Sequence, residues 1–305
     1  MDRTLLRPLA RVLCAAAVLL AISAQSQNLF VSNIGSGLAG AGSIVVYKPG
    51  GERSTFATGL SLPIGLAFDN GGNLFEADQQ SGNVYRFTPG GVRSTFATGL
   101  YEPQGLAFDS AGNLYECDYG SHFANTGFLH RFTPDGSMST IATGLNPTAL
   151  AIDHLGNVFV TDIETSCIYK FTPGGVQSTF DTGGAYHPWG LAFNRAGDLF
   201  EATYDYDLSN GAIYRFTPGG VKTTFATGLT RPMGLAFDDE DNLFVTDADG
   251  TGAIYEYAPN GTRRTFATGI AINGAGVTFQ VPEPSGLALL ACAAVSGLFA
   301  SQRRR

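Results

Sequence analysis

The chain has 305 residues, a charged fraction of 14% and a formal net charge of −8. Between residues 27 and 281 no basic run occurs, and this acidity argues against a nucleic-acid phosphate backbone as a partner. We therefore expect no nucleic acid among its ligands.

The first 25 residues have the order of a secretory signal peptide. Arg3, Arg7 and Arg11 precede an apolar run over 12–22, and small residues follow. A basic start, a short apolar segment and small residues at the cleavage site are the parts of such a signal. Residues 1–25 are therefore predicted to direct export, with cleavage between 23 and 26; an uncleaved anchor is the alternative.

A repeated phrase occupies the middle of the chain. Asn-Leu-Phe-x-x-Asp recurs in variant form, opening at residues 28, 73, 113, 157, 198 and 242. Intervals of about 40 to 45 residues are typical of one four-stranded propeller blade per repeat. In the unit around residue 230 the four β runs are 233–238, 242–247, 253–257 and 263–268, which we name strands a to d.

The chain enters the first repeat at strand b, so that blade lacks a strand a of its own. Gly276-Val-Thr-Phe279 matches Gly65-Leu-Ala-Phe68 and supplies the missing strand. Pairing the two ends leaves no unpaired sheet edge between them. Residues 27–281 are therefore predicted to be an all-β, six-bladed propeller of four-stranded antiparallel blades, closed by the C-terminal strand joining the N-terminal blade.

Alignment of the repeats indicates that most of the Asp residues, and both Cys residues between 27 and 281, have structural roles. Asp-x-x-Gly-Asn, as at 69–73, links strands a and b and suits a tight turn in which Gly takes a positive φ. Cys117 and Cys167 stand where other repeats have small or uncharged residues. Both are expected to be small packed side chains rather than a disulfide pair.

Three carboxyl groups break the repeat. Glu76, Glu116 and Glu201 stand in strand b where other repeats carry Val. A carboxylate between blades is costly unless it is paired or near water. We expect these residues either to form an acidic cluster on the channel side or, as the favoured interpretation, to lie near solvated strand ends and bond a neighbouring Tyr or backbone amide.

The positions that vary most flank the Pro before strand a, and they should ring the mouth of the central channel. The pairs are Leu62 and Ile64, Glu102 and Gln104, Asn146 and Thr148, His187 and Trp189, Arg231 and Met233, and Asn273 and Ala275, where Gly274 replaces the Pro. Apolar walls with a few converging polar groups suit a small-molecule site. Glu102, His187 and Arg231 are the candidate catalytic residues; the alternative is that all these positions merely escape packing constraints.

The loops from strand b to strand c are long in alternate blades, and they add Tyr119, Tyr204 and Tyr206 as candidate binding residues. Their rings can stack on a sugar or a peptide. Asp205 and Asp207 resemble the start of a calcium loop, but the Gly and Glu that complete such a loop are missing. No metal or other cofactor is predicted, although a divalent metal is left open.

The last 25 residues hold three features in order: Pro282-Glu283-Pro284, an uncharged stretch over 285–301, and Arg303, Arg304 and Arg305. As a helix, the uncharged stretch is about 26 Å long, enough to cross a thinned hydrocarbon layer. This order closely resembles the PEP-CTERM sorting signal of bacterial surface proteins. The resemblance implies an exosortase-type processing enzyme as a partner, an inner-membrane-anchored precursor, and a final place at the cell surface or in the extracellular matrix; an ordinary C-terminal anchor is the alternative.

The phrases Gly-Leu-Ala-Phe-Asp, Leu-Phe-x-x-Asp and Tyr-x-Phe-Thr-Pro resemble NHL-type six-bladed propellers, a group that includes gluconolactonase-like and streptogramin-lyase-like proteins. Gluconolactonase-like enzymes hold a divalent metal with a Glu, Asn residues and an Asp that precedes a strand-a Gly. Neither Asp nor Asn occupies that place here, where the residues are Ile64, Gln104, Thr148, Trp189, Met233 and Ala275.

The sequence therefore favours an exported, surface-sorted binding protein whose ligand is an envelope or matrix glycan or a protein. A periplasmic lactonase- or lyase-like enzyme that uses the same face is the first alternative. A structural component of extracellular polymer is the second.

Overall fold

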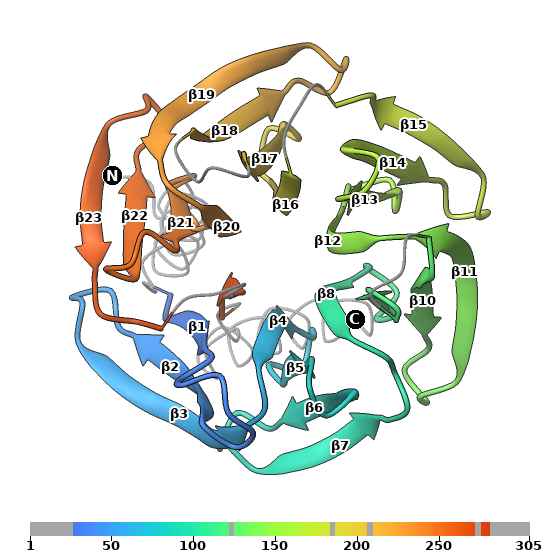
Figure 1. Cartoon of the computed structure of the whole chain (residues 1–305), viewed down its shortest axis with the longest axis horizontal. Coiled ribbons are helices and arrows are strands. Elements are labelled where there is room, and N and C mark those ends of the chain that lie inside the picture. The colour runs from blue at the N-terminus through green and yellow to red at the C-terminus, as the bar shows by residue number, and fades with distance from the viewer. Residues whose placement is uncertain (1–26, 122–124, 184–186, 206–209, 272–275, 281–305) are drawn as a thin grey trace, which may run out of the picture. The chain divides into compact units, whose positions relative to one another are not determined.

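The computed structural model describes residues 27–121, 125–183, 187–205, 210–271 and 276–280. Their strands form six four-stranded antiparallel sheets that follow one another around a central axis, as Figure 1 shows. The compact unit spans Asn28–Gln280. The predicted all-β, six-bladed propeller is confirmed.

Each blade begins with its strand a at the channel and ends with its strand d at the rim. Blade 1 comprises β24 (Val277–Phe279), β1 (Leu29–Asn33), β2 (Gly42–Tyr47) and β3 (Arg53–Leu60). Blades 2 and 3 comprise β4 (Pro63–Phe68), β5 (Leu74–Asp78), β6 (Asn83–Phe87) and β7 (Arg93–Ala97), then β8 (Pro103–Phe108), β9 (Leu114–Asp118), β10 (Gly127–Phe132) and β11 (Met138–Leu145). Blades 4 and 5 comprise β12 (Pro147–Ile152), β13 (Val158–Asp162), β14 (Cys167–Phe171) and β15 (Gln177–Asp181), then β16 (His187–Phe193), β17 (Leu199–Tyr204), β18 (Gly211–Phe216) and β19 (Lys222–Leu229). Blade 6 comprises β20 (Pro232–Phe237), β21 (Leu243–Asp247), β22 (Ala253–Tyr257) and β23 (Arg263–Ala267).

The ring is closed by strands from the two ends of the domain. β24 pairs antiparallel with β1, so that Val277 lies opposite Val31 and Phe279 opposite Leu29. The amide of Gln280 donates to the carbonyl of Asn28 at 3.1 Å. The predicted closure is confirmed, because the last strand of the domain is the innermost strand of its first blade.

The hydrophobic core lies between blades rather than at the centre. Each of six clusters of buried residues joins two neighbouring blades. A strand-b Phe recurs in most of them, as with Phe75, whose ring meets Phe96 and Phe108 edge-on at 5.0 and 4.9 Å. Such pairs stabilise beyond the area that they bury, by about 0.5–1.5 kcal/mol each. The repeated Phe positions therefore fix blade against blade.

The Asp residues between strands a and b are turn residues, as predicted. The Asp69 carboxylate accepts hydrogen bonds from the amides of Gly71 and Asn73 at 2.9 and 2.8 Å. Gly72 has a φ of 74°, a conformation that costs Gly little. In blade 6 Asp241 takes the equivalent place with a φ of 60°, because Asp tolerates the left-handed region better than most residues.

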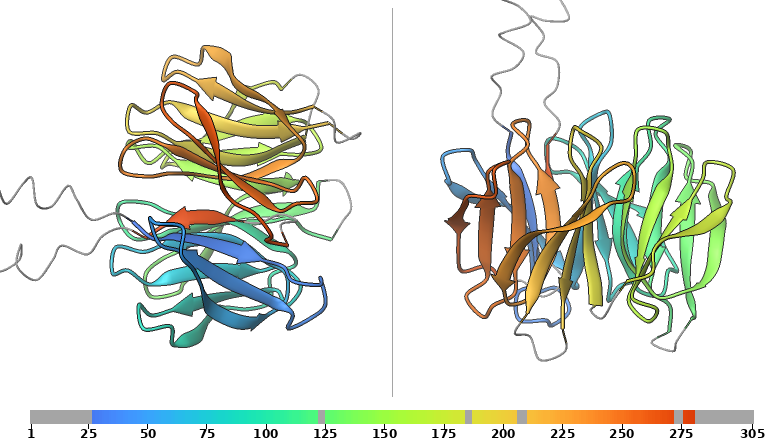
Figure 2. Two further views of the ribbon diagram at one scale, coloured as in Figure 1. Left: turned by 90° about the vertical axis from the view of Figure 1, so that its left-hand side faces the viewer. Right: turned by 90° about the horizontal axis from the view of Figure 1, so that it is seen from above.

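The linkers from strand d to the next strand a share one face with the loops from strand b to strand c. The amide of Gln79 donates to the carbonyl of Leu62, and that of Tyr119 donates to Glu102, both at 3.0 Å. We name this the channel-mouth face. Asn28 and Gln280 belong to the opposite strand ends, beside the turns between strands a and b, and Figure 2 shows the propeller from the side.

The Asp residues that end strand b hold those linkers in place. Asp118 accepts from the amide of Tyr101 at 2.9 Å, and Asp247 accepts from that of Arg231 at 2.6 Å. Asp78 and Asp162 do the same for their linkers. Backbone donors that would otherwise be unpaired are thereby satisfied.

The predicted signal peptide (1–25) and sorting signal (281–305) fall wholly outside the described residues, so Pro282, Glu283, Pro284, Arg303, Arg304 and Arg305 stay predictions. Among the residues that are described, no helix has the length and apolar character needed to cross a membrane. Cys117 is fully buried, Cys167 is half-buried, and both are free thiols.

Candidate functional site

Three candidate residues gather on blade 5. His187 and Trp189 belong to β16 and Tyr204 to β17, and all three are half-buried. The Tyr204 ring centroid lies 5.8 Å from that of His187 and 6.1 Å from that of Trp189. The β-sheet register explains this, because His187 pairs directly with Tyr204 and a register shift follows between Pro188 and Gly190. We call these three residues the aromatic group.

The imidazole of the aromatic group is neutral near pH 7. Partial burial lowers the pKa of His187, and the nearby Glu164 carboxylate opposes that shift without overcoming it. A neutral imidazole both donates and accepts a hydrogen bond. The group therefore offers aromatic surface together with a polar edge, a combination suited to sugar rings.

The other two candidate catalytic residues lie on different blades from His187. Glu102 precedes β8, and its carboxylate accepts from Gln79 Nε2 at 3.1 Å. Arg231 precedes β20, where Asp247 holds its backbone amide. Glu102 is thus held through its side chain, and Arg231 through its backbone amide.

Several members of the predicted ring are packed inside the propeller. The exposed fractions are 7% for Ile64, 3% for Gln104 and Asn146, and 2% for Thr148 and Met233. The Thr148 hydroxyl lies 2.9 Å from Thr161 Oγ1 and donates to the Pro188 carbonyl at 3.0 Å. Such contacts join inner strands of neighbouring blades and leave little surface for a ligand.

Close approach of the inner strands explains this packing. A Cβ on Gly65 would lie 1.9 Å from the carbonyl oxygen of Gln104. Only Gly allows backbones to come so near. The strand-a Gly of the repeat is therefore a packing residue.

The remaining candidates are placed in part. Tyr119 is half-buried where the loop of blade 3 begins, and the Asp205 carboxylate accepts from Asn210 Nδ2 at 2.6 Å. Tyr206, Asp207 and Asn273 lie outside the described residues.

The expectation for the three strand-b carboxyl groups is wrong. Glu76, Glu116 and Glu201 lie between blades, with exposed fractions of 0%, 0% and 2%, instead of near solvated strand ends. Neither carboxyl oxygen of Glu76 or Glu116 has a hydrogen-bond partner within the described structure. Burial, and next the charge of Asp78 or Asp118, raises the pKa of both well above the usual range.

Glu201 differs from the other two because a cation lies near it. Lys222 Nζ is 3.6 Å from Glu201 and 2.7 Å from the Asp181 carboxylate of blade 4. Burial raises the pKa of Glu201 to about 7, although Lys222 opposes the shift. Burial favours the neutral form of Lys222, but the hydrogen bond that Lys222 donates to Asp181 and the charge of Glu201 raise its pKa overall.

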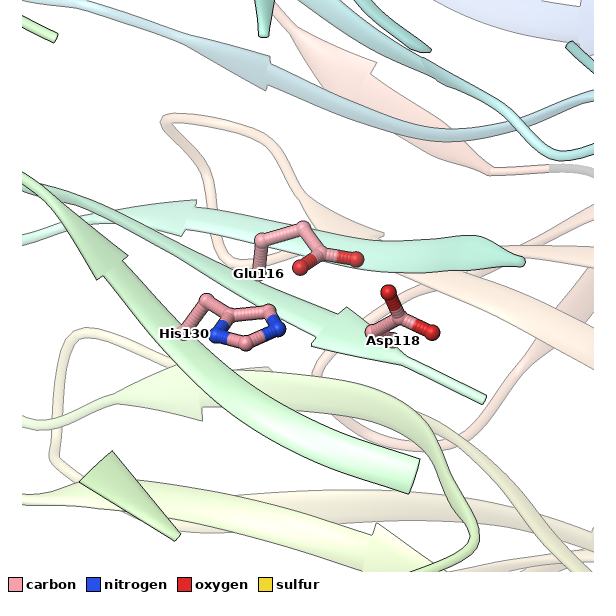
Figure 3. Close-up of side chains that lie close together, drawn as sticks. All are labelled: Glu116, Asp118 and His130. Carbon is pink, nitrogen blue, oxygen red and sulfur yellow. The ribbon is translucent and has the colours of Figure 1, made fainter. Parts of the chain in front are cut away.

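One group of side chains has the composition of a metal site. Glu116, Asp118 and His130 are all buried, and one potential ligand atom from each lies within 4.8 Å of the others. Figure 3 shows the two carboxyl groups and one ring nitrogen turned toward the same point. The sequence analysis did not single out His130, because it sits in strand c with no metal motif around it. Its place opposite Glu116 in the sheet is the signal that could have identified it.

The face opposite the channel mouth carries a cavity of about 250 Å³ between blades 1 and 2, with Lys48, Phe56 and Gln280 among its lining residues. None of the candidate residues named above contributes to that lining.

Comparison with known proteins shows the fold alone. No protein-family model and no curated protein matches the chain. A chain from the crystal structure of a nidogen/laminin complex is 20% identical with a TM-score of 0.69, and the match covers 84% of this chain and 98% of that one. Virginiamycin B lyase from Staphylococcus aureus is 17% identical with a TM-score of 0.56, covering 76% and 78%. A gluconolactonase from Xanthomonas campestris is also 17% identical with a TM-score of 0.56, covering 67% and 74%. The chain thus shares its propeller architecture with proteins of binding and of enzymatic function.

Proposed function

We propose that the protein is an exported, surface-sorted propeller that binds a glycan of the cell envelope or matrix through its channel-mouth face. The observation that carries this proposal is the aromatic group, in which the Tyr204 ring lies near the rings of both His187 and Trp189 on blade 5. Aromatic rings with a wet, polar edge are typical of sites that stack on amphipathic ligands. A protein that binds to the same face is the second possible ligand, and binding measurements distinguish it from a glycan.

The placing of the chain ends supports this proposal. Asn28 and Gln280 are joined by hydrogen bonds on the face opposite the channel mouth. Gln280, the last described residue before the predicted sorting signal, therefore lies on the face away from the aromatic group.

Replacing the aromatic group is expected to weaken binding. We predict that Trp189→Ala and Tyr204→Ala each reduce affinity for the bound oligosaccharide by about tenfold, because each removes one stacking surface. Leu155→Ala is the matched control: Leu155 is 67% exposed in a turn on the opposite face and should not change affinity. A glycan array identifies the ligand, and isothermal titration calorimetry then measures the affinity of each variant for it.

The outcomes of that titration separate the alternatives. Equal affinity in Trp189→Ala, Tyr204→Ala and the wild type would remove the aromatic group from the binding site. Binding to a matrix protein but to no glycan, with the same sensitivity to substitution, would keep the face and change the ligand class.

The enzymatic alternative has one observation in its favour, which is a neutral His187 at the channel mouth. A neutral imidazole can act as a general base. Turnover of lactones that disappears in His187→Ala while ligand affinity persists would support a lactonase- or lyase-like enzyme.

A further inference from the structure

We propose that Glu116, Asp118 and His130 bind one divalent transition-metal ion, with zinc the best fit, in a buried site between blades 2 and 3. The site is distinct from the aromatic group, so it does not depend on the proposed function.

Sheet geometry brings the three side chains together. Glu116 and Asp118 are two residues apart on β9 and so point to the same face of the sheet. His130 on β10 is the direct cross-strand partner of Glu116. Leu114 and Phe132, which flank the same face, pack into the cluster shared with blade 2. The three possible ligand atoms therefore converge in a buried interface between blades, as Figure 3 shows.

Glu116 is the residue that most needs a partner. Its side chain is fully buried, it points at Asp118 and His130, and neither of its carboxyl oxygens is hydrogen-bonded to any described residue. Buried polar groups are nearly always paired, and an exception calls for an explanation such as a bound ion. A cation among the three side chains gives the Glu116 carboxylate the partner that it lacks.

The other two proposed ligands, His130 and Asp118, are held in position by hydrogen bonds to neighbouring residues. His130 Nδ1 lies 3.1 Å from Thr140 Oγ1, which leaves Nε2 to face the carboxyl groups. Asp118 accepts from the amides of Tyr101, Glu102 and Gly120. Hydrogen bonds of this kind fix the ring orientation and tautomer of a metal-binding His and hold the ligating carboxylates.

Comparison of the repeats shows that the His is a specific departure. Blade 2 has the same carboxyl pair, Glu76 and Asp78, but Tyr85 stands opposite Glu76. Tyr also occupies this strand-c position in blades 4, 5 and 6, at Tyr169, Tyr214 and Tyr255. Thr95 lies opposite Tyr85 as Thr140 lies opposite His130. Among the described strands, blade 3 alone combines the two carboxyl groups with an imidazole.

The ligand types select the class of metal. One imidazole nitrogen with two carboxylates suits zinc and related transition metals, whereas calcium and magnesium favour oxygen ligands alone. With three protein ligands, water completes a tetrahedral zinc site. An ion here would join β9 to β10 directly beneath the linker that carries Glu102, and would thereby stiffen the channel-mouth face.

Metal analysis of the purified protein tests this site. After removal of metals with a chelator, reloading with ZnCl₂ and desalting, mass spectrometry of the elements should find about one zinc per wild-type chain. His130→Tyr, which installs the residue of blades 2, 4, 5 and 6, should hold less than about a tenth of that amount. Glu76→Gln is the matched control and should retain full loading. Zinc should also raise the melting temperature of the wild type by about 5 °C and leave that of His130→Tyr unchanged.

A second variant keeps the test decisive if His130→Tyr folds poorly. Tyr85→His with Arg93→Met reproduces in blade 2 the side chains of blade 3, where Met138 occupies the place of Arg93. This double variant should hold about two zinc ions per chain. A wild type that retains no zinc, a folded His130→Tyr chain that loads like the wild type, or a double variant that stays at the wild-type content would each overturn the proposal.

Discussion

Removing the closing strand is expected to cost the domain most of its stability. A chain that ends at Gly274 should melt about 15 °C below one that ends at Val281, because β24 completes blade 1. Val277 is 7% exposed, and Phe279 packs edge-on against Phe244 of blade 6 at 4.9 Å. Full burial of such a side chain contributes about 1.5–3 kcal/mol, which applies to Val277, while the partly buried Phe279 contributes a part of that amount.

Hydrogen bonds add to this loss. Gly276 donates to the Ile64 carbonyl at 2.8 Å and accepts from the Ser32 amide at 3.0 Å, so the strand joins blade 2 as well as blade 1. Each bond contributes about 0.5–1.5 kcal/mol. The sum is comparable to the whole stability of an ordinary domain, about 5–15 kcal/mol.

Calorimetry of the two truncated chains checks this prediction. A synthetic peptide with the sequence of residues 275–281, added to the shorter chain, should restore much of the melting temperature by filling the vacant strand position. Equal melting temperatures for the two chains would show that closure contributes little.

The propeller architecture was predictable because the same pattern of strand and turn residues recurs in each repeat. Leu-Phe in strand b, Gly in strand a and Asp in the turn recur in nearly every blade, and each has one physical role. The closing strand followed from the same alignment, since residues 276–279 match 65–68. Repetition thus separates packing and turn residues from those that vary.

The candidate site was predictable from the sequence only where residues that are close in space are also close together in the chain. His187 and Trp189 are two residues apart on one strand, whereas their approach to Tyr204 depends on the register between β16 and β17. The partner of Glu116 was missed because the loop between strands b and c differs in length among blades, so that His130 in blade 3 and Tyr85 in blade 2 stand at different distances along the chain from their Glu. Cross-strand register, which the sequence does not state, brings these groups together.

Burial of the strand-b carboxyl groups was also not predicted from the sequence. It leads to the expectation that replacing one of these Glu residues with an apolar residue stabilises the protein. Glu76→Val is expected to raise the free energy of unfolding by about 1–3 kcal/mol near pH 5, because a buried carboxyl without partners carries an uncompensated desolvation penalty. Val31, Val160 and Val245 occupy the same position in blades 1, 4 and 6, so the substitution suits the fold.

The stabilisation by Glu76→Val, measured as the increase in the free energy of unfolding over the wild type, should grow as the pH rises. Burial raises the pKa of Glu76 in the folded state well above its ordinary value of 4.5, so between 4.5 and the folded pKa the folded protein binds a proton that the unfolded chain has lost. Stability of the wild type therefore falls with rising pH through that window, by up to about 1.4 kcal/mol per pH unit for this group. Below pH 4.5 both states are protonated, and the pH dependence from Glu76 disappears.

Urea unfolding of the wild type, Glu76→Val and Glu76→Gln between pH 4 and 8 separates the two effects. The amide of Glu76→Gln does not ionise, so this variant should lose the pH-dependent part while it keeps a buried polar group. Glu76→Val should lose both. A wild type whose stability rises across this range as steeply as that of Glu76→Val would mean that Glu76 ionises in the folded state, and a partner for its charge would then have to exist between blades 1 and 2.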